Sequence, residues 1–330
     1  MSKILSVIIP GYNIEKYIDF GLPTFLDDEI LGDIEVLIID DGSKDNTAQK
    51  GLQYEKQYPN TVKLISKENG GHGSTINKGI EKATGKYFKV VDGDDWVETN
   101  GFKNLVSYLK TCDCDIVANQ YYRVDDKTKK KEERNFRNIE FNRVYVFDEV
   151  CNKIDRIELH AMTIKTDILK NNHILIDENK YYVDVEYILF PIPFVKTVVF
   201  LKDYVYMYRV STDTQSMSVA NLQKNKQQHI DVFFRLIDFF NNVKLSISNE
   251  KCRYIARRLE FMAWQQYLIY FSFPKSNEVK EELVAFDQKI KLLCPEVYNI
   301  GTNKKLALLR KSRFALYQPA AFYQRIRQNG

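Results

Sequence analysis

The sequence is poor in cysteine. It has five cysteines among 330 residues, an odd number, and none of them belongs to a Cys-x-x-Cys pair. A disulfide scaffold would be shorter and richer in cysteine, and a structural zinc site or a redox dithiol would normally use such a pair. We therefore expect the thiols to be buried or idle.

Long apolar runs are also absent. No stretch approaches the roughly 18 consecutive apolar residues of a membrane-spanning helix. The aliphatic run at residues 4–10 is too short, and too soon followed by polar residues, for a signal peptide. These features predict a cytoplasmic chain whose membrane contact is at most peripheral, on the inner face of the cell membrane.

The sequence has no strong excess of charge of one sign. The 48 Lys and Arg residues face 44 Asp and Glu residues, and the net charge of +4 is too small to predict a nucleic-acid partner. The hydrophobic fraction of 44% and the aromatic fraction of 13% exclude a disordered chain. The length permits one large domain with an appendage, or two domains, and nothing specifies an oligomeric state.

The first hundred residues alternate aliphatic runs with amphipathic segments. The runs at 4–9, 34–39, 62–65 and 87–91 predict strands, and the segments at 17–26, 45–58 and 74–83 predict helices. Continuous aliphatic strands that alternate with helices predict a parallel sheet covered on both faces. Ligands of such sheets bind beyond the carboxyl ends of the strands, so the chemistry is expected there.

The pattern changes twice further along the chain. Apolar segments at 116–118, 198–201 and 205–208 predict more strands, and the mixed charges at 125–134 predict a solvated hairpin tip. After residue 218, long helical periodicity predicts helices at 227–243, 251–270 and 278–293. We expect an α/β domain over residues 1–218 and a helical C-terminal region over residues 219–330.

Polar clusters follow three of the predicted strands, at residues 10–13, 40–45 and 92–96. Turns need glycine and aspartate for backbone reasons alone, so a single cluster is more often structural than functional. Several aspartates at one sheet edge repel each other unless they bind a cation, bond ligand hydroxyls or cap helices. Asp92 and Asp94, on alternate residues, can converge on one Mg²⁺ or Mn²⁺ that phosphate oxygens and water also coordinate.

These blocks together resemble the nucleotide-sugar-binding half of family 2 glycosyltransferases, which have the GT-A fold. The matching blocks are residues 7–15, 39–47, 69–85 and 92–95, and the resemblance is close over residues 3–110, looser to about 216 and negligible beyond. It implies an α/β fold with a Rossmann-like mixed, mainly parallel sheet flanked by helices. It also implies a nucleotide-sugar half over residues 1–110 and an acceptor half over residues 111–218.

The same resemblance implies a site for a UDP-sugar donor. Asp41, with Asp40 behind it, would contact the uracil or ribose, because a carboxylate accepts from an imide N–H or a ribose hydroxyl. Asp92 would reach the ribose or sugar, and Asp94 would bind a Mn²⁺ or Mg²⁺ that bridges the diphosphate, with Asp92 as a second ligand. The complete set of predicted nucleotide-sugar-binding residues is Pro10, Tyr12, Asn13, Glu15, Asp40, Asp41, Gly71, His72, Asn77, Asp92, Gly93, Asp94, Asp95 and Arg209.

Several of these residues allow two interpretations. His72, in a loop with more glycines than the family usually has, could contact the diphosphate or donor sugar, or have no ligand role. Asp95 could contact the donor sugar or cap a helix. Arg209, before a segment at Gln215 and Ser216 that resembles a family loop over the diphosphate, could pair with phosphate or form a surface salt bridge. His160 matches an acceptor-side or metal-proximal position, or is a core histidine.

An inverting transferase also needs a base that deprotonates the acceptor hydroxyl. The family places an aspartate at the start of a helix on the acceptor side, usually after a glutamate. Asp184 is the matching residue, although Val183 stands where the glutamate is usual. Glu186 is the competing base, and the plainer interpretation is that Asp184 caps a helix.

The last thirty residues contain seven basic residues and no acidic residue, interleaved with apolar side chains. Such a segment could lie on an anionic membrane surface, or pack against the catalytic domain with a solvated basic face. The sequence as a whole predicts a metal-dependent, inverting hexosyl- or N-acetylhexosaminyl-transferase. It would act from a UDP-sugar onto a glycan or lipid-linked glycan acceptor of a bacterial surface or capsular polysaccharide. The alternative is a non-catalytic nucleotide-sugar or glycan-binding protein on the same fold.

Overall fold

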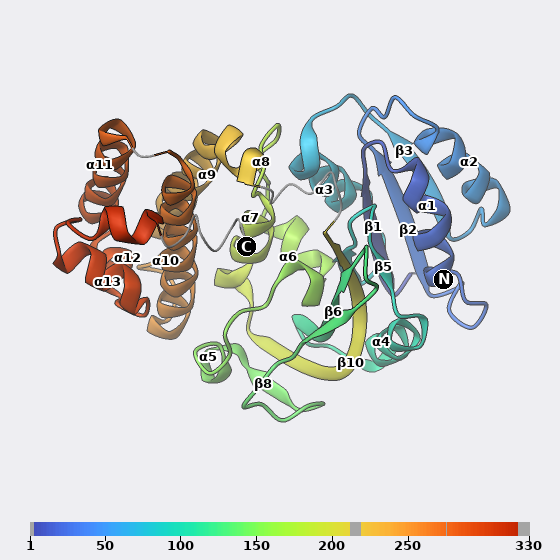
Figure 1. Cartoon of the computed structure of the whole chain (residues 1–330). Helices are drawn as coiled ribbons and strands as arrows, with labels where there is room; N and C mark the ends of the chain where they lie inside the picture. The colour runs from blue at the N-terminus through green and yellow to red at the C-terminus, as the bar shows by residue number, and fades with distance from the viewer. Residues whose placement is uncertain (1–2, 212–218, 275, 323–330) are drawn as a thin grey trace. The chain divides into compact units, whose positions relative to one another are not determined.

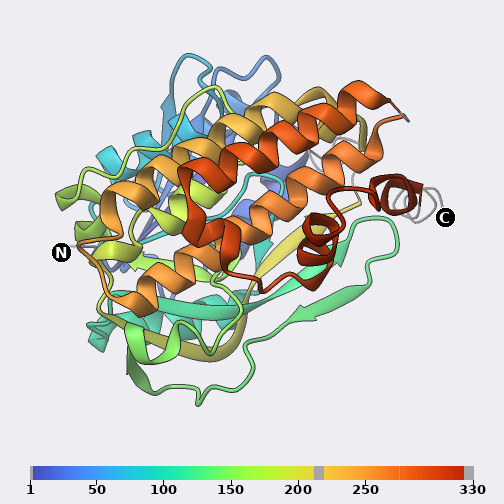
Figure 2. The same ribbon diagram turned by 90° about the vertical axis from the view of Figure 1, so that its left-hand side faces the viewer.

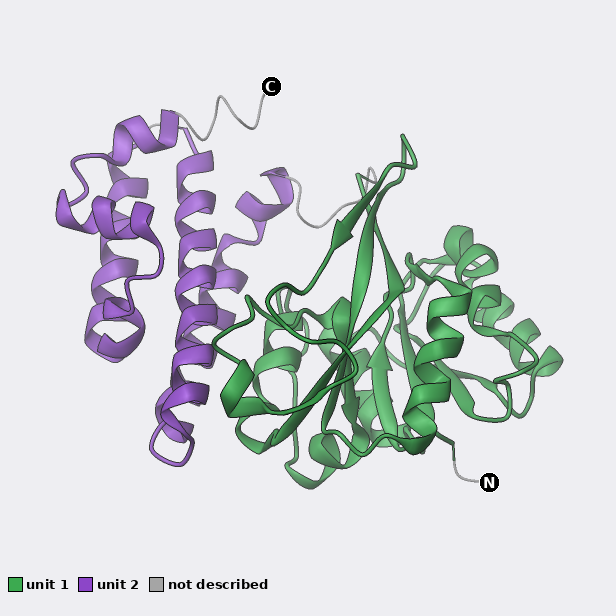
Figure 3. Cartoon of the chain, turned by 90° about the horizontal axis from the view of Figure 1, so that it is seen from below, with its two compact units in different colours: residues 1–213 green, residues 214–330 purple. Residues whose placement is uncertain are grey.

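The computed structural model describes residues 3–211, 219–274 and 276–322 (Figure 1). The chain forms two compact units, unit 1 over residues 1–213 and unit 2 over residues 214–330 (Figure 3). The predictions for Gln215 and Ser216, and those for residues 323–330, lie outside the described residues.

Unit 1 is built on one ten-stranded sheet. The order along the sheet is β3-β2-β1-β4-β9-β6-β10-β5, with β7 paired to β6 and β8 paired to β10. The strands are β1 (Leu5–Gly11), β2 (Ile34–Asp40), β3 (Val62–Ser66), β4 (Tyr87–Val90), β5 (Trp96–Val97), β6 (Ile116–Asp125), β7 (Lys131–Arg134), β8 (Val144–Val146), β9 (Met162–Lys165) and β10 (Thr197–Val210).

The strand directions decide which residues meet at one edge of the sheet. β1, β2, β3 and β4 are mutually parallel, β9 is antiparallel to both β4 and β6, and β10 is parallel to β6. β1, β2, β3, β4, β6 and β10 therefore run in the same direction, which confirms a mixed, mainly parallel sheet. Their carboxyl ends share one edge, and β9 begins at that edge because it runs the opposite way.

The helices of unit 1 cover both faces of the sheet. Right-handed crossovers from β1 to β2 and from β2 to β3 place α1 (Glu15–Gly21) and α2 (Thr47–Gln57) on one face. The return crossover from β3 to β4 places α3 (Gly71–Lys82) on the other face (Figure 1). β1 is buried along its whole length, as a strand covered on both faces should be.

The remaining helices of unit 1 are η1 (Leu22–Phe25), α4 (Thr99–Thr111), α5 (Phe147–Val150), η2 (Leu159–Ala161), α6 (Thr166–Asn171), α7 (Asp184–Leu189) and η3 (Ile192–Phe194). Of these helices, η1 follows α1, α4 follows β5, and the others lie in the acceptor half. The charged segment 125–134 forms the predicted hairpin, since β7 pairs antiparallel with β6. The strands predicted at 198–201 and 205–208 are one strand, β10, with two shifts of register between them.

Unit 2 is helical, and its long helices confirm the predicted ones. They are α8 (Val219–Lys224), α9 (Lys226–Val243), α10 (Asn249–Ser272), α11 (Asn277–Leu293), α12 (Pro295–Asn299) and α13 (Lys304–Lys311). α9, α10 and α11 lie side by side (Figure 2). The side chains of Ser248 and Ser276 cap the first turns of α10 and α11. Among the described residues, no helix is long and apolar enough to cross a membrane.

Candidate active site

The acidic turn at residues 92–95 connects β4 to β5 at the edge where the parallel strands end. It lies very close to β1, because a Cβ on Gly93 would be 2.5 Å from the carbonyl oxygen of Pro10 and 2.7 Å from Ile14 Cδ1. Only glycine fits this approach. Gly93 and Pro10, both predicted site residues, thus bring the acidic turn against the end of β1.

The end of β10 holds the acidic turn through Asp95. The Tyr206 hydroxyl donates to Asp95 Oδ2 at 2.6 Å and accepts from the Asp92 backbone N–H at 3.0 Å. The Arg209 backbone N–H donates to Asp95 Oδ1 at 2.6 Å. Asp95 is buried, and α4 is capped by Glu98, so the expectation that Asp95 caps a helix is wrong.

Arg209 does not present a free guanidinium to a phosphate in this structure. Its Nε donates to the Asp94 carbonyl oxygen at 2.7 Å and its Nη1 donates to Asp126 Oδ1 at 2.5 Å. The guanidinium also lies over the rings of Tyr17 and Trp96, at 5.0 Å and 4.7 Å from their centroids. The ion pair with Asp126 agrees with the salt-bridge interpretation, but the Arg209 side chain is only 9% exposed, so the pair is largely buried on the arginine side. A phosphate contact would require these bonds to break.

His72 faces the acidic turn from the first turn of α3. Its Nε2 lies 2.8 Å from Asp92 Oδ1. Burial lowers the pKa of His72, but the attraction of Asp92 outweighs it, and Asp184 and Asp94 add to that attraction, so the pKa is raised. Burial raises the pKa of Asp92, but the attraction of His72 outweighs it and the pKa is lowered. The two side chains therefore form a hydrogen-bonded pair in which each favours the charged form of the other.

The carboxylates next to Asp92 are not neutralised in the same way. Burial raises the pKa of Asp94, and the charge of Asp92 raises it further. Burial raises the pKa of Asp95 well above its ordinary value, with added repulsion from Asp94 and Asp92. A divalent cation would relieve this repulsion.

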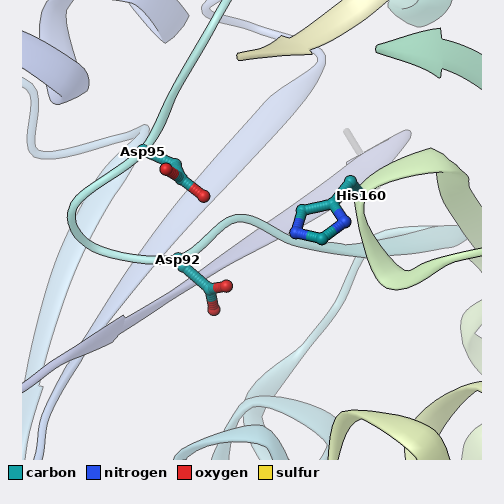
Figure 4. Close-up of side chains that lie close together, drawn as sticks. All are labelled: Asp92, Asp95 and His160. Carbon is teal, nitrogen blue, oxygen red and sulfur yellow. The ribbon is translucent and has the colours of Figure 1, made fainter. Parts of the chain in front are cut away.

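One group of side chains at the acidic turn could hold a metal ion. Ligand atoms of Asp92, Asp95 and His160 all lie within 4.8 Å of one another (Figure 4). His160 belongs to η2, immediately before β9, so the antiparallel direction of β9 brings it to this edge. Of the two predicted metal ligands, the group includes Asp92, and Asp95 and His160 accompany it in place of Asp94.

His160 is held in a form that suits a ligand. Its ring is stacked between those of Tyr121 and Tyr208, at centroid distances of 5.1 Å and 4.2 Å, and Tyr206 meets it edge-on. Burial lowers the pKa of His160 to about 4, so the imidazole is neutral near pH 7. Its buried Nδ1 has no hydrogen-bond partner among the described residues. These observations fit a metal ligand better than a satisfied core histidine.

Asp41, predicted to contact the uracil or ribose, is buried and bonded to the segment that connects β3 to α3. Its Oδ1 accepts from the Gly70 N–H at 2.9 Å and from Lys67 Nζ at 2.8 Å, and its Oδ2 accepts from the Gly71 N–H at 2.8 Å. Asp40 is also buried and accepts from the Ser43 N–H. In this structure both aspartates shape loops at the sheet edge, and their nucleotide contacts stay predictions.

The loop after β1 is fastened to the loop after β2. Asn13, whose φ of 54° is left-handed, accepts from the Lys44 N–H through Oδ1 at 2.8 Å. Glu15 accepts from the Asn46 N–H through Oε2 at 2.6 Å. Tyr12, immediately before Asn13, is 49% exposed. The contacts hold the backbone on one side of Tyr12, and its predicted contact with the donor stays a prediction.

Asn77 binds the acceptor half of unit 1. Its Nδ2 donates to the Ile176 carbonyl oxygen and its Oδ1 accepts from the Ile176 N–H, both at 2.9 Å. The Asn179 N–H donates to the Gly70 carbonyl oxygen at 2.6 Å, next to Gly71, whose φ is +79°. Asn77 thus positions residues 176–179, and a donor contact from its amide would compete with these bonds.

The two candidate bases differ in their surroundings. Glu186 is fully buried, and its Oε2 accepts from the Asp177 N–H at 2.7 Å. Asp184 is the first residue of α7, and its charge helps to raise the pKa values of His72 and Tyr208, so it lies near both side chains. Val183 occupies the N-cap position, and Asp184 lies in the first turn of α7. Glu186 is thus engaged inside the protein, and the choice of Asp184 as the base stays a prediction.

Some site residues carry little signal in the sequence. Tyr206 was not predicted, although Tyr206 and Tyr208 alternate along β10 and so share a face of the sheet. Gly73 was not singled out either, and a Cβ on it would lie 1.9 Å from the Asp177 carbonyl oxygen. The alternation of tyrosines was the one pattern that could have identified Tyr206.

Three comparisons place the chain among known proteins. The minor teichoic acid biosynthesis protein GgaB of Bacillus subtilis is 30% identical over 250 residues, which are 72% of this chain and 27% of GgaB. The structure of S. aureus TarS in complex with UDP-GlcNAc superposes with a TM-score of 0.64 at 17% identity, over 98% of this chain and 89% of that one. Mannosyltransferase PcManGT from Pyrobaculum calidifontis, solved with GDP-Man and Mn²⁺, gives a TM-score of 0.53 at 14% identity, over 99% and 88% of the two chains.

The structural likenesses, at such low identity, establish the fold alone. The chain matches about a quarter of the length of GgaB. The model described as "Glycosyl transferase family 2" matches residues 6–170, which are half of the sequence. This chain therefore belongs to glycosyl transferase family 2.

Proposed function

We propose that this protein transfers a hexosyl or N-acetylhexosaminyl group from a UDP-sugar to a hydroxyl of a glycan acceptor. The observation that carries the proposal is the meeting of the acidic turn and His160 at one edge of the sheet, with Asp184 near His72. Family membership supports sugar transfer. TarS, solved with UDP-GlcNAc, supports a UDP-sugar donor, and GgaB, named for teichoic acid biosynthesis, supports a bacterial surface glycan as acceptor.

In the proposed reaction, Asp184 accepts the proton of the acceptor hydroxyl while the hydroxyl oxygen bonds to the anomeric carbon of the donor sugar. The bond between that carbon and the diphosphate oxygen breaks, and UDP leaves with the bonding electrons. Attack from the side opposite the leaving group inverts the anomeric configuration. A bound divalent cation supplies charge neutralisation for the departing diphosphate.

The residues present fit Mn²⁺ or Mg²⁺. The carboxylates of Asp92 and Asp95 suit either ion, and the neutral imidazole of His160 favours Mn²⁺. PcManGT, solved with Mn²⁺, supports this choice. Calorimetric titration of Mn²⁺ into the Asp94→Ala and Asp95→Ala variants distinguishes the two ligand sets. If Asp94 binds the ion, as the family resemblance implies, its variant loses more affinity; if Asp95 does, the order reverses.

The activity is tested by measuring UDP release over a panel of UDP-sugars with Mn²⁺ or Mg²⁺. We expect release from at least one donor, loss of that release with a chelator, and loss in Asp94→Ala. Full activity in Asp94→Ala would reject the role of Asp94 in metal binding. Binding of UDP in calorimetry, without turnover over a broad panel of donors and acceptors, would favour the non-catalytic nucleotide-sugar-binding protein instead.

We also propose that residues 301–322 contact an anionic membrane on its cytoplasmic face. Leu306 and Leu309 pack inside unit 2, whereas Leu308 and Phe322 are 57% and 63% exposed. Exposed basic side chains lie among them: Lys304, Lys305, Lys311 and Arg313. Such a surface combines apolar contact with attraction to anionic lipid.

Flotation with vesicles that contain phosphatidylglycerol tests this surface. Leu308→Glu and Phe322→Glu should reduce flotation, and Leu245→Glu should not, since Leu245 is 93% exposed but lies in the turn between α9 and α10. Equal flotation of all three variants and the wild type would remove the proposal. Truncation near residue 300 is a poorer test, because the Asn303 N–H donates to the buried Glu260 at 3.2 Å.

A further inference from the structure

We propose that residues 175–184 form a subsite for the acceptor sugar, in which the ring of Tyr181 stacks on the apolar face of a pyranose. The proposal rests on the proposed function and deepens it, since it assigns one element of acceptor recognition to a particular side chain. It depends on three features of this segment: an exposed aromatic ring, a fixed backbone, and proximity to Asp184.

Tyr181 is the most exposed aromatic side chain of this segment. It is 50% exposed, and Leu175 on the same segment is 61% exposed, although the segment packs against α3. Tyr181 precedes Asp184 by three residues, so even a fully extended chain keeps their Cα atoms within about 11 Å. A sugar stacked on Tyr181 therefore lies near the carboxylate that would deprotonate its hydroxyl.

The backbone that presents Tyr181 is fixed by bonds on both sides of the ring. Ile176 is bound through both its N–H and its carbonyl by Asn77, and the Asn179 N–H donates to the Gly70 carbonyl oxygen. The Asp177 N–H donates to the buried carboxylate of Glu186, a residue that follows Tyr181 in the sequence. A side chain on a fixed backbone loses little freedom when it binds a ligand, which favours recognition.

Two residues of the segment have left-handed backbone conformations. The φ of Asn179 is 56° and that of Tyr182 is 68°. Asparagine tolerates this region, but for tyrosine it is unfavourable and persists only where the surroundings require it. Tyr182 redirects the chain immediately before α7, and leaves the ring of Tyr181 exposed while its own side chain is half-buried.

The chemistry of the ring selects a sugar rather than a charged ligand. One face of many pyranoses carries only C–H groups, and these are attracted to the negative face of an aromatic ring. The hydroxyls at the edge of the same sugar stay free to reach Asp184. Stacking of this kind recognises the shape of a pyranose more than its identity, so simple glycosides serve as probes.

Saturation-transfer NMR with methyl glycosides tests the subsite. The probes are methyl β-glucoside, methyl β-galactoside and methyl N-acetyl-β-glucosaminide, each added to the full chain with UDP and Mg²⁺. We expect saturation of the C–H face of at least one probe, about tenfold weaker binding in Tyr181→Ala, and recovery in Tyr181→Trp. The matched control is Phe194→Ala, an exposed ring in η3 just before the start of β10, at the opposite edge of the sheet.

Two outcomes would overturn the proposal. One is equal binding by Tyr181→Ala and the wild type, and the other is no saturation of any probe in the wild type. Calorimetry of UDP with the same proteins reports separately on the donor site and on correct folding. If the wild-type protein does not bind UDP, the proposed function is refuted, whatever the glycosides show.

Discussion

Replacement of Gly73 by alanine should push the acceptor segment at residues 176–177 away from α3. Gly73 lies in the first turn of α3, where a Cβ would be 1.9 Å from the Asp177 carbonyl oxygen and 2.9 Å from Ile176 Cγ2. Ordinary contact begins at 3.4 Å, so the acceptor segment or α3 must move by about 1.5 Å. The first of these neighbours is backbone, which cannot rotate away.

The displacement has a cost in stability and a cost in rate. Overpacking of this kind costs about 2 kcal/mol, which lowers the melting temperature of a unit of this size by roughly 4–8 °C. The moved segment leads to Asp184, and misplacement of a catalytic group by about 1 Å can reduce the rate about 100-fold. Donor binding should change less, because the acidic turn is held by β1 and β10.

Thermal unfolding and UDP release in the presence of an acceptor measure the two effects. Gly32→Ala is the matched control, because a Cβ on Gly32 meets nothing within 4 Å. If Gly73→Ala has the same melting temperature and the same kcat as Gly32→Ala, the reasoning is refuted. A lower melting temperature with unchanged kcat would show that docking of the segment does not position Asp184.

Three further predictions concern single side chains. Asp184→Asn should reduce kcat by about 100-fold or more with unchanged UDP affinity. Glu186 is buried, so Glu186→Gln should mainly lower the melting temperature. Unimpaired transfer by Asp184→Asn would reject Asp184 as the base. His160→Ala should weaken Mn²⁺ binding about 10-fold or more in calorimetry, and an unchanged affinity would exclude His160 as a ligand. Burial lowers the pKa of His229 to about 4 from 6.5, so its contribution to stability is complete above pH 6.5 and is lost as the pH falls towards 4. His229→Leu should flatten this dependence in thermal unfolding, and an identical slope would contradict it.

The sequence predicted the main strands and helices of the first ninety residues because their signals are local. The aliphatic run at residues 4–9 became β1 (Leu5–Gly11), with every residue buried. The polar residues that follow β1, β2 and β4 do lie at one edge, since parallel strands end together. Gly93 could be identified because its neighbours Asp92 and Asp94 already marked the turn.

Other parts of the site depend on contacts that no local pattern encodes. Tyr206 bonds to Asp95 across 111 positions of the sequence, and His160 reaches the turn only because β9 runs antiparallel. Residue type showed what Arg209 and Asn77 can bind, but the fold selected their partners: Asp126 for one and Ile176 for the other. The nucleotide contacts of these residues therefore stay predictions.

The acidic turn affects the stability of the native state. The raised pKa values of Asp94 and Asp95 mean that the native state without a cation keeps these carboxylates in unfavourable surroundings. A cation that binds the native chain but not the unfolded chain then stabilises it in proportion to the logarithm of its concentration. If the proposed metal site is occupied, the cation therefore contributes to the stability of the folded chain as well as to the reaction.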